Sequence, residues 1–243
     1  MAASIKPYKN SEQSKKDQIR RMFDNISCDY DQLNRVISFG IDNAWRKKVI
    51  EWVSRTNPKS ILDVATGTGD LALMFKNSGA EKIVGLDLSP GMLEIGRKKV
   101  ISEGLTSLID MVVGDSEQLP FEDNTFDAIT VSFGIRNFED LELGLSEIRR
   151  VLRPGGIFVI LETSVPTKFP YKQGYKIYTQ TLLPTIGRIF SKDKVAYQYL
   201  SDSAAVFPYG EALNNILRKV GFTNVVAHPQ TFGVATIYTA GKS

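Results

Sequence analysis

The chain alternates short apolar runs with helix-like segments across its middle, and this alternation constrains the fold more than any other feature. Apolar runs occupy residues 60–65, 82–87, 109–114, 126–133 and 156–162. Helix-like segments lie between them, over residues 70–77, 90–102 and 141–152. Strands that are apolar throughout and alternate with helices predict a parallel sheet with helices on both faces.

Two regions outside this alternation complete the predicted architecture. Residues 1–58 look helical, and residues 165–220 form an aromatic-rich helical insertion before two last strands, 224–227 and 233–239. We therefore expect a single α/β domain with a mostly parallel sheet of seven strands. Its parts are a helical N-terminal lid (1–58), a cofactor-binding core (59–164), a helical substrate cap (165–220) and the final strands (221–243).

Composition excludes several classes of protein. The longest apolar stretches, 131–135 and 157–161, are far shorter than the ~20 residues that a membrane-spanning helix needs. The N-terminal segment is polar and basic, without the apolar core of a secretory signal. The single cysteine, Cys28, excludes an internal disulfide and a Cys-rich zinc cluster, and no other group has metal-ligand spacing. These features predict a cytoplasmic protein without a metal.

The net charge of +3 does not favour nucleic-acid binding. Lysines and arginines gather at residues 15–21 and 46–48, where a solvated helix surface is favoured over a basic binding patch. We therefore expect no nucleic-acid partner.

A glycine-rich turn between the first strand and the first helix is the main candidate for a cofactor site. Its sequence is Asp63-Val-Ala-Thr-Gly67-Thr-Gly69-Asp70. Glycines let the backbone bend tightly and approach a ligand, and the following helix offers unpaired amide groups. Asp87, twenty positions after Gly67, ends the second strand, where an acid can bind ribose hydroxyls. Dinucleotide-binding enzymes share both features, which by themselves leave the ligand open.

A third acid separates the two interpretations. Asp115 follows the third strand and can accept a hydrogen bond from an adenine amino group. Carboxylates at three neighbouring strand tips (Asp63, Asp87 and Asp115) repel a pyrophosphate but favour a cationic sulfonium. Each acid alone could be a helix cap, but three beside a glycine turn favour S-adenosyl-L-methionine as the cofactor. A short-chain dehydrogenase would also carry Tyr-x-x-x-Lys on a central helix, and this chain has it only at 238–242, in a strand-like stretch.

Several longer stretches, which together cover nearly the whole chain, carry a family resemblance. They are Tyr30-Asp-x-Leu-Asn34-x-x-Ile-Ser38-Phe-Gly40 followed by Trp45, then Leu119–Asp127, Ser132–Asn137, and Arg150-Val-Leu-Arg-Pro-Gly-Gly156 leading to Glu162-Thr-Ser164. With these stretches the chain resembles the ubiquinone/menaquinone biosynthesis C-methyltransferases. Asp42 stands where the first signature has histidine, and Thr163 stands where the second often has phenylalanine. The resemblance implies a class I S-adenosylmethionine-dependent methyltransferase (Rossmann-like) fold. It also implies an enzyme that methylates a ring carbon of a polyprenylated hydroquinone.

The turn and the resemblance together assign individual residues. The residues expected to bind the cofactor are Asp63, Gly67, Thr68, Gly69, Asp87, Asp115, Ser116 and Ser132. In this assignment Asp87 holds the ribose, Asp115 and Ser116 hold the adenine, and the remaining side chains surround the methionine end. The lid residues expected to contact the substrate are Tyr30, Asn34, Ser38 and Trp45, with helix packing as their alternative role.

The loop after the fourth strand is the predicted centre of catalysis. A ring carbon becomes nucleophilic when a neighbouring hydroxyl loses its proton, so a base or a fixed cation is useful there. Our hypothesis is that Arg136 stabilises the developing phenolate and that Asn137 orients it, or orients a water that accepts the proton. The alternative for Arg136 is an ion pair with Glu139 or Asp140.

The sequence leaves the substrate and the assembly open. The resemblance favours demethylmenaquinol, with the benzoquinol of the ubiquinone pathway as the alternative and an RNA or protein substrate as a weaker one. Residues 168–200 interleave lysines with aromatic residues. This pattern fits a cap over a lipid-like substrate, peripheral contact with the inner face of a membrane, or an ordinary amphipathic subdomain. A homodimer is also allowed.

Overall fold

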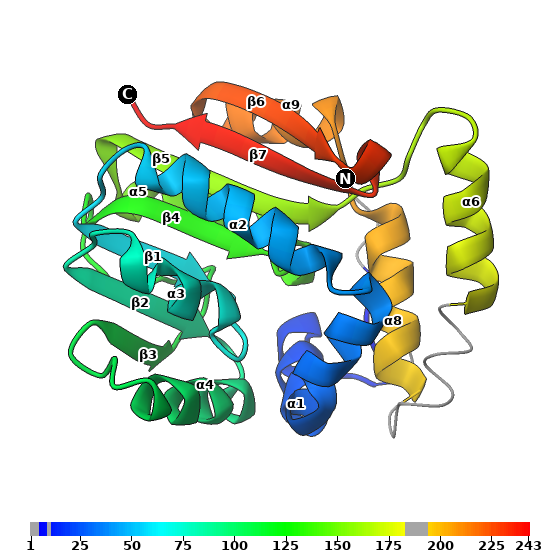
Figure 1. Ribbon diagram of the computed structural model, residues 1–243, viewed down its shortest axis with the longest axis horizontal. Helices are drawn as coiled ribbons and strands as arrows, with labels where there is room; N and C mark the ends of the chain where they lie inside the picture. Colours follow the sequence, from blue (N-terminus) through cyan, green and yellow to red (C-terminus); the bar gives the residue numbers. More distant parts are fainter. Residues whose placement is uncertain (1–4, 9–10, 183–193) are drawn as a thin grey trace.

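The centre of the molecule is one sheet of seven strands in the order β3-β2-β1-β4-β5-β7-β6 (Figure 1). The computed structural model describes residues 5–8, 11–182 and 194–243, so the part of the expected cap at 183–193 lies outside the described residues. Strands β1 to β5 are parallel to one another, whereas β7 is antiparallel to β5 and to β6. The predicted mostly parallel, seven-stranded sheet is confirmed. The strands are β1 (Ser60–Val64), β2 (Lys82–Asp87), β3 (Ile109–Val113), β4 (Phe126–Ser132), β5 (Leu152–Thr163), β6 (Thr223–Gln230) and β7 (Ala235–Gly241).

The helices follow the expected alternation closely. The predicted helix at 90–102 is confirmed with the same first and last residues. The Ser89 side chain accepts a hydrogen bond from the backbone N–H of Met92, and Pro90 opens the first turn, so the start of the helix is fixed locally. The described helices are α1 (Lys15–Ser38), α2 (Ile41–Ser54), α3 (Asp70–Met74), η1 (Phe75–Asn77), α4 (Pro90–Ser102), η2 (Ile135–Asn137), α5 (Leu141–Val151), α6 (Tyr171–Ile177), η3 (Tyr178–Leu182), α8 (Lys194–Val206), α9 (Glu211–Val220) and η4 (Thr231–Gly233).

The start of β5 differs from the prediction. The sequence predicted a helix that ends at residue 152 and a strand that begins at residue 156, but the strand already begins at Leu152, which pairs with Phe126 of β4. The register then shifts between Phe126 and Ala128. An irregularity of this kind lets proline lie inside a strand without breaking a ladder hydrogen bond, and the strand therefore extends beyond the predicted start.

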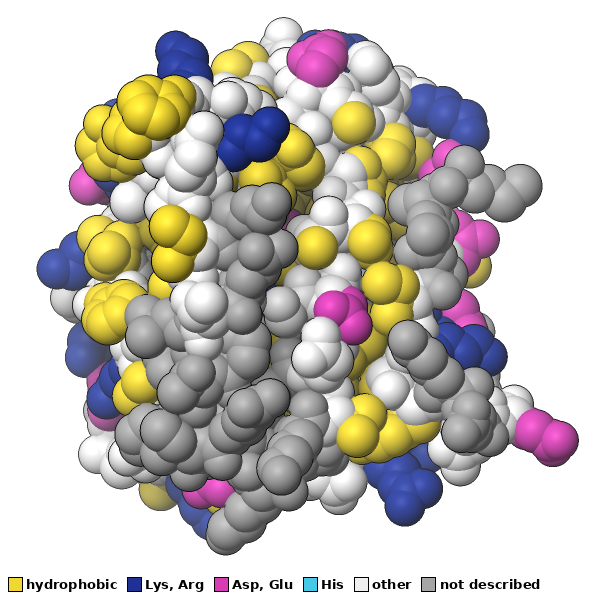
Figure 2. Space-filling view, turned by 90° about the vertical axis from the view of Figure 1, so that its right-hand side faces the viewer, with side chains coloured by type: hydrophobic (Ala, Val, Ile, Leu, Met, Phe, Trp, Pro, Cys, Tyr) yellow, Lys and Arg dark blue, Asp and Glu magenta, His cyan; other side chains and the backbone are white. Residues whose placement is uncertain are grey.

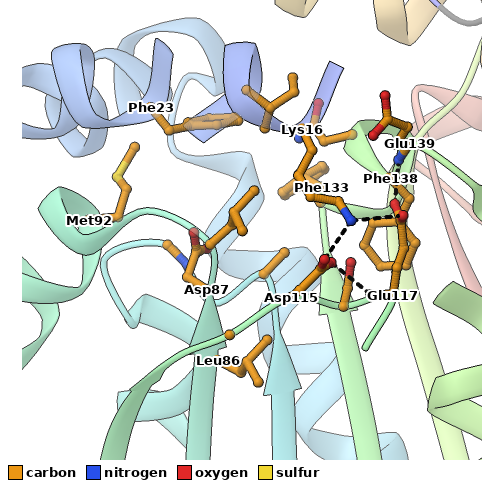
Figure 3. A pocket seen from close by; sticks show the side chains of 18 of the residues that line it. Lys16, Phe23, Leu86, Asp87, Met92, Asp115, Glu117, Phe133, Phe138 and Glu139 are labelled. Carbon is orange, nitrogen blue, oxygen red and sulfur yellow. Dashed lines mark hydrogen bonds and ion pairs between the residues drawn. The ribbon is translucent and has the colours of Figure 1, made fainter. Parts of the chain in front are cut away.

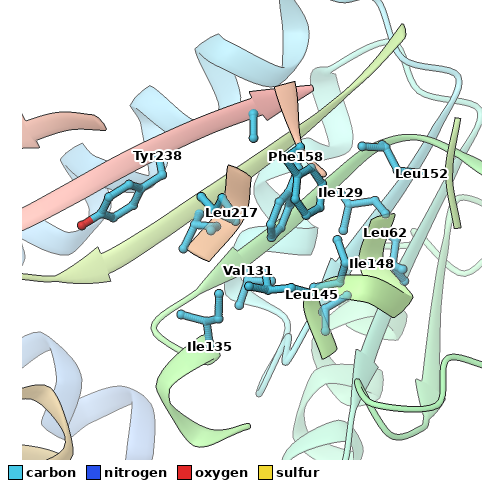
Figure 4. Close-up of a cluster of buried hydrophobic side chains, with 14 of the residues drawn as sticks. Leu62, Ile129, Val131, Ile135, Leu145, Ile148, Leu152, Phe158, Leu217 and Tyr238 are labelled. Atoms are coloured by element: carbon cyan, nitrogen blue, oxygen red, sulfur yellow. The ribbon is translucent and has the colours of Figure 1, made fainter. Parts of the chain in front are cut away.

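Side chains of the strands alternate between two buried layers. On one side Leu62, Ile129 and Phe158 pack against α5 and α9 (Figure 4). On the other side Ile61 and Ala128 pack with residues of α2, α3 and α4. Helices therefore cover both faces of the sheet, which explains why its strands are apolar throughout.

A third, smaller core belongs to the helical cap. Ile19, Met22 and Ile26 of α1 pack with Met92 of α4 and with Tyr199 of α8. Figure 1 shows α1, α8 and α6 at the end of the sheet toward which the parallel strands point. Ligands of open α/β sheets bind beyond the carboxyl ends of the strands, so the cap covers the place where a ligand is expected. Among the described residues, no helix combines the length and the apolarity needed to cross a membrane.

Candidate functional site

A pocket lies between α1 and the carboxyl ends of the parallel strands (Figure 3). Its wall combines the glycine turn, the residues that follow β2 and β3, the end of β4 and the inner side of α1. The structure thus brings together segments that are distant in the sequence. The residues predicted from the sequence that line it are Tyr30, Gly67, Asp87, Asp115, Ser116, Ser132 and Asn137.

The backbone of the glycine turn fixes Asp87. One carboxylate oxygen accepts from the Gly67 N–H at 2.8 Å, and the other accepts from the Ser89 N–H at 2.9 Å. Gly67 has a φ of +59°, a left-handed conformation that glycine adopts without strain. Burial raises the pKa of Asp87, while these backbone donors oppose the rise. The carboxylate is therefore held in one orientation at the pocket wall.

Asp63 and Gly69 lie behind the wall and do not line the pocket. The Asp63 carboxylate is buried and accepts hydrogen bonds from the hydroxyls of Thr66 at 2.6 Å and Thr130 at 2.7 Å. Burial raises its pKa to about 6, although both hydroxyls act against the rise. A side chain at Gly69 would collide with the methyl group of Met111, 2.2 Å from an ideal Cβ. Both residues set the shape of the turn, and their contact with a cofactor remains a prediction.

Thr68 also lies outside the pocket lining and instead connects the turn to the lid. Its hydroxyl donates to Asp31 of α1 at 2.6 Å. Lys99 of α4 binds the same Asp31 at 2.5 Å and Asp70 of α3 at 2.6 Å. These contacts hold α1 against the helices that follow the first two strands.

The carboxylate expected at the adenine position is paired with a lysine of the lid. Lys16 of α1 lies 2.5 Å from Asp115 and 3.2 Å from Glu117. Glu117 in turn accepts from the backbone N–H of Glu139. The formal charges of the pocket wall are thus four carboxylates, Asp87, Asp115, Glu117 and Glu139, against the single Lys16. This excess favours a cationic ligand over a diphosphate.

Ser132 gives an independent reason to expect a polar ligand. Its hydroxyl is buried at the pocket wall and has no hydrogen-bond partner among the described residues. Buried hydroxyls are nearly always hydrogen-bonded, so an unpartnered one at a pocket marks a place for a ligand group. The residues present therefore fit a polar, positively charged cofactor such as S-adenosylmethionine.

Arg136 forms a buried ion pair, but not with the partners considered from the sequence. The Glu139 or Asp140 pairing is wrong, because Arg136 Nη1 lies 2.5 Å from Glu162 Oε1 at the end of β5. The side chains are 8% and 1% exposed. Arg136 Nε and Glu162 Oε2 have no hydrogen-bond partner among the described residues. The pair lies beside the pocket rather than in its wall, and its two unpartnered atoms are available to a ligand that reaches it.

Three tyrosines, one each from α1, α6 and α8, interact with the arginine of this ion pair. Tyr30 of α1, Tyr175 of α6 and Tyr199 of α8 all interact electrostatically with Arg136. Burial raises the pKa of Tyr199 to about 12, with Arg136 acting in the opposite direction, so its hydroxyl keeps its proton. The Tyr199 hydroxyl donates a hydrogen bond to Asn137 Oδ1 at 3.2 Å. Asn137 thus links the pocket wall to Tyr199 of α8.

The lid residues predicted to contact the substrate occupy different positions. Tyr30 lines the pocket, and Asn34 bonds to it. Ser38 instead donates to Asp42 at 2.6 Å, and Trp45 donates to the Thr231 hydroxyl at 2.8 Å. In the structure Ser38 and Trp45 contact other protein residues, in line with the packing role that was their alternative. Their contact with substrate stays a prediction.

Sequence reasoning missed three residues of this region. Lys16 was part of a basic cluster assigned to the surface, and Tyr199 carries no distinguishing pattern. Glu162 belongs to a quoted signature, where a lone acid at the end of an apolar strand was the available signal. Within the described parts of the chain, no group of three or more His, Cys, Asp or Glu residues is placed to hold a metal ion.

Comparison with known sequences gives matches along nearly the whole chain. Residues 11–242 match the ubiE/COQ5 methyltransferase family. The demethylmenaquinone methyltransferase of Bacteroides fragilis is 49% identical over 239 residues, covering 98% of this chain and 97% of that protein. The ubiquinone/menaquinone biosynthesis C-methyltransferase UbiE of Geobacter sulfurreducens is 44% identical over 230 residues, 94% of this chain and 90% of that protein.

Comparison with solved structures confirms the fold. The [4+2]-cyclase SpnF has a TM-score of 0.66 at 19% identity and covers 93% of this chain and 95% of its own. A possible histamine N-methyltransferase from Thermotoga maritima has a TM-score of 0.60 at 19% identity, over 93% of this chain and 100% of its own. At such low identity the likeness concerns the fold alone, which is that of class I S-adenosylmethionine-dependent methyltransferases.

Proposed function

The chain belongs to the ubiE/COQ5 methyltransferase family, and from this premise we propose that it methylates a ring carbon of demethylmenaquinol to give menaquinol. It is an S-adenosylmethionine-dependent C-methyltransferase, as its family implies. The full-length similarity to proteins named demethylmenaquinone methyltransferase carries the choice of substrate. The acidic pocket at the carboxyl edge of the sheet supports the choice of cofactor.

The cofactor assignment rests on groups that the fold has already oriented. Asp87 presents carboxylate oxygens to the two ribose hydroxyls, Asp115 and Ser116 bind the adenine, and Ser132 receives the amino-acid end. When bound, S-adenosylmethionine supplies a methyl group on a positively charged sulfur that leaves as a neutral thioether. The protein's main task is then to align the ring carbon with that methyl group.

The ion pair beside the pocket is the proposed catalytic centre. The substrate ring lies against Asn137, with one hydroxyl directed toward Arg136 and Glu162. Glu162 Oε2 accepts the hydroxyl proton, directly or through a water, and Arg136 stabilises the phenolate that forms. The ring carbon then forms its bond to the methyl group, and its own hydrogen leaves as a proton to water, which restores the aromatic ring. Glu162 returns the proton that it accepted to the ring oxygen, so the product keeps both hydroxyls.

Two variants test this assignment. Glu162→Gln keeps the size of the side chain but removes its basicity, and we expect kcat to fall about 10²- to 10³-fold. Thr163→Val, which removes one hydroxyl that donates to Glu162 Oε1, is the matched control and should reduce kcat only a few-fold, to about a third. Cofactor affinity, measured by calorimetry, should stay near the wild-type value in both. Wild-type turnover in Glu162→Gln or in Arg136→Ala would remove these residues from the mechanism.

The ring preference needs its own experiment. The relatives include proteins named for menaquinone alone and proteins named for both quinones. Transfer of a labelled methyl group should be measured on a naphthoquinol and a benzoquinol that carry the same prenyl tail. We expect the naphthoquinol to be methylated with the higher kcat/KM. A higher value for the benzoquinol would assign this chain to the ubiquinone pathway instead.

The division of labour within the chain follows from the same contacts. We assign cofactor binding to residues 59–164 and substrate contact to the described parts of 1–58 and 165–220. Tyr30, Tyr175 and Tyr199 support this, because α1, α6 and α8 each contribute one tyrosine that interacts electrostatically with Arg136. The final strands complete the sheet beside β5.

A further inference from the structure

Exposed apolar side chains gather on the outer side of the cap. Figure 2 shows hydrophobic side chains along one side of the cap face, with Lys and Arg side chains among them. The exposed apolar residues of these segments include three phenylalanines that are about two-thirds exposed or more. We call the whole set the apolar patch, and its members are Phe39 (67% exposed), Ile41 (40%), Phe169 (79%), Tyr171 (41%), Ile177 (64%) and Phe232 (66%).

Ring contacts join the three segments of the apolar patch into one surface. Tyr171 stacks on Phe232 with ring centroids 3.9 Å apart and an angle of 4°. Phe39 lies 6.3 Å from Tyr178, whose hydroxyl donates to the backbone of Ile37. The patch is therefore continuous from the α1–α2 junction across α6 to η4.

Two of the phenylalanines sit at turns that do not favour them. Phe39 has a φ of +51° and Phe232 a φ of +57°, a left-handed conformation in which bulky side chains are rare. Apart from these ring contacts, about two-thirds of each side chain is nevertheless exposed to solvent. Each ring thus has one aromatic contact, but it leaves most of its surface uncovered in an unfavourable backbone conformation, which favours a partner that covers it.

The charge around the apolar patch identifies what covers it. Residues 163–182 contain no Asp or Glu, and neither does the whole segment after Glu211. Lys168 and Lys172 are exposed beside Phe169 and Tyr171. Exposed aromatic rings flanked by lysines, without acids, match an anionic membrane surface, where rings enter the headgroup boundary and lysines pair with lipid phosphates.

The patch is also close to the proposed reaction site. Trp45 donates to Thr231, the neighbour of Phe232, and its ring centroid lies 6.3 Å from that of Phe133 in the pocket wall. α6 carries both Tyr171 of the patch and Tyr175, which interacts with Arg136. A polyprenylated substrate could therefore keep its tail in the bilayer while its ring reaches Arg136.

We propose that the apolar patch docks the enzyme on the surface of an anionic lipid bilayer, so that a prenylated substrate reaches the cap directly from the lipid. This docking rests on the proposed function only for its biological role. The exposed rings and lysines that support it do not depend on the identity of the substrate. It makes the lipid surface, rather than the aqueous phase, the source of substrate.

Co-sedimentation with vesicles tests the docking surface. The probes are vesicles of phosphatidylcholine alone and of phosphatidylcholine with phosphatidylglycerol, both without quinone. Phe39→Asn/Phe232→Asn removes the two rings, and asparagine suits the left-handed backbone. Ile101→Asn on α4 and Leu143→Asn on α5 are matched controls, since these residues are 65% and 48% exposed elsewhere on the molecule.

We expect wild type and controls to bind the anionic vesicles and the double variant to bind about tenfold more weakly. Lys168→Glu/Lys172→Glu, a change of exposed residues only, should remove the preference for phosphatidylglycerol. Equal binding of wild type and double variant, or no wild-type binding to either vesicle, would overturn the proposal. So would a concentration-dependent dimer that the double variant loses, because a second copy of the chain would then cover the patch.

Activity in solution separates the two proposals. A demethylmenaquinol analogue with a short, soluble side chain should be methylated equally by wild type and double variant, since the patch lies outside the reaction site. Failure of wild type to methylate it while still binding vesicles would refute the proposed function and leave the docking surface standing.

Discussion

The two walls of the pocket are built in different ways. On the sheet side, backbone N–H groups from the glycine turn and from the residues after β2 fix Asp87. On the cap side, contacts such as Lys16–Asp115 and Asp31–Lys99 join side chains from distant segments, and each partner is about a quarter exposed or more. Exposed ion pairs contribute only about 0–1 kcal/mol each. The cofactor wall is thus preformed, whereas the cap wall is held by weak contacts that can separate without disturbing the sheet.

The Arg136–Glu162 pair lies on the sheet side and interacts with tyrosines of the cap. Among the changes that test the difference between the two walls, its disruption has the largest expected effect. Glu162→Ala would leave a buried guanidinium without its counterion. We expect the free energy of unfolding to fall by about 3–5 kcal/mol, measured by urea denaturation. The double variant Arg136→Met/Glu162→Leu should regain most of this stability without regaining activity. If the double variant were as unstable as Glu162→Ala, the pair would serve folding rather than catalysis.

A substitution at Asp63 tests whether the buried carboxylate that supports the sheet wall lowers the stability of the folded state. Its native pKa of about 6 lies above the ordinary value of 3.8, so the folded state binds the proton more tightly than the unfolded state does. Its contribution to stability therefore falls as pH rises from about 4 to about 6 and stays low above that, by about 3 kcal/mol at 1.36 kcal/mol per pKa unit. Urea denaturation across this pH range should show the fall in wild type. Asp63→Asn should lack it, and an identical pH profile in both proteins would contradict the raised pKa.

Asp87 measures what the preformed wall contributes to cofactor affinity. Asp87→Ala should weaken S-adenosylmethionine binding by about 2 kcal/mol, or roughly 30-fold, because charged hydrogen bonds to the ribose are lost. Calorimetry measures the dissociation constant. Asp110→Ala is the control, since this acid lies on β3 away from the pocket and is exposed. Equal affinity of Asp87→Ala and wild type would place the ribose elsewhere.

Lys16 gives the smallest effect and probes the cap wall. Its ammonium group pairs with the carboxylate of Asp115, which we assign to binding the adenine. Lys16→Met should therefore free this carboxylate and tighten cofactor binding by at most about 1 kcal/mol. The same calorimetric titration measures the change. Weaker binding in this variant would mean that Lys16 itself holds the cofactor.

Sequence reasoning succeeded where short segments carry the information. The helix at 90–102 is defined by its own cap and proline, and Gly67 and Asp87 belong to one β1–α3–β2 unit of neighbouring parallel strands. It succeeded less well at 152–156, where proline and glycine predicted a break but pairing with Phe126 across the sheet extended the strand. Local preference decides an element only where no neighbouring strand competes.

The site followed the same rule. From the sequence, Arg136 was expected to pair with an acid three or four residues away, yet its partner is 26 residues further along on β5. No periodicity could have indicated this, because β4 and β5 are adjacent in the sheet and their ends converge at one edge. The tyrosines of α1, α6 and α8 meet there for the same reason: helix packing, rather than sequence spacing, brings them together.

The sequence by itself determined the alternating architecture, the glycine turn with its acids and the family of the chain, because each depends on residues a few positions apart or on long similarity. Only the tertiary structure decided that Asp63 supports the turn from behind, that Glu162 partners Arg136 and that three distant segments share one exposed apolar surface. Those outcomes depend on which elements become neighbours in space. Neighbourhood of that kind is set by packing across the sheet and the cap, which no single stretch of sequence contains.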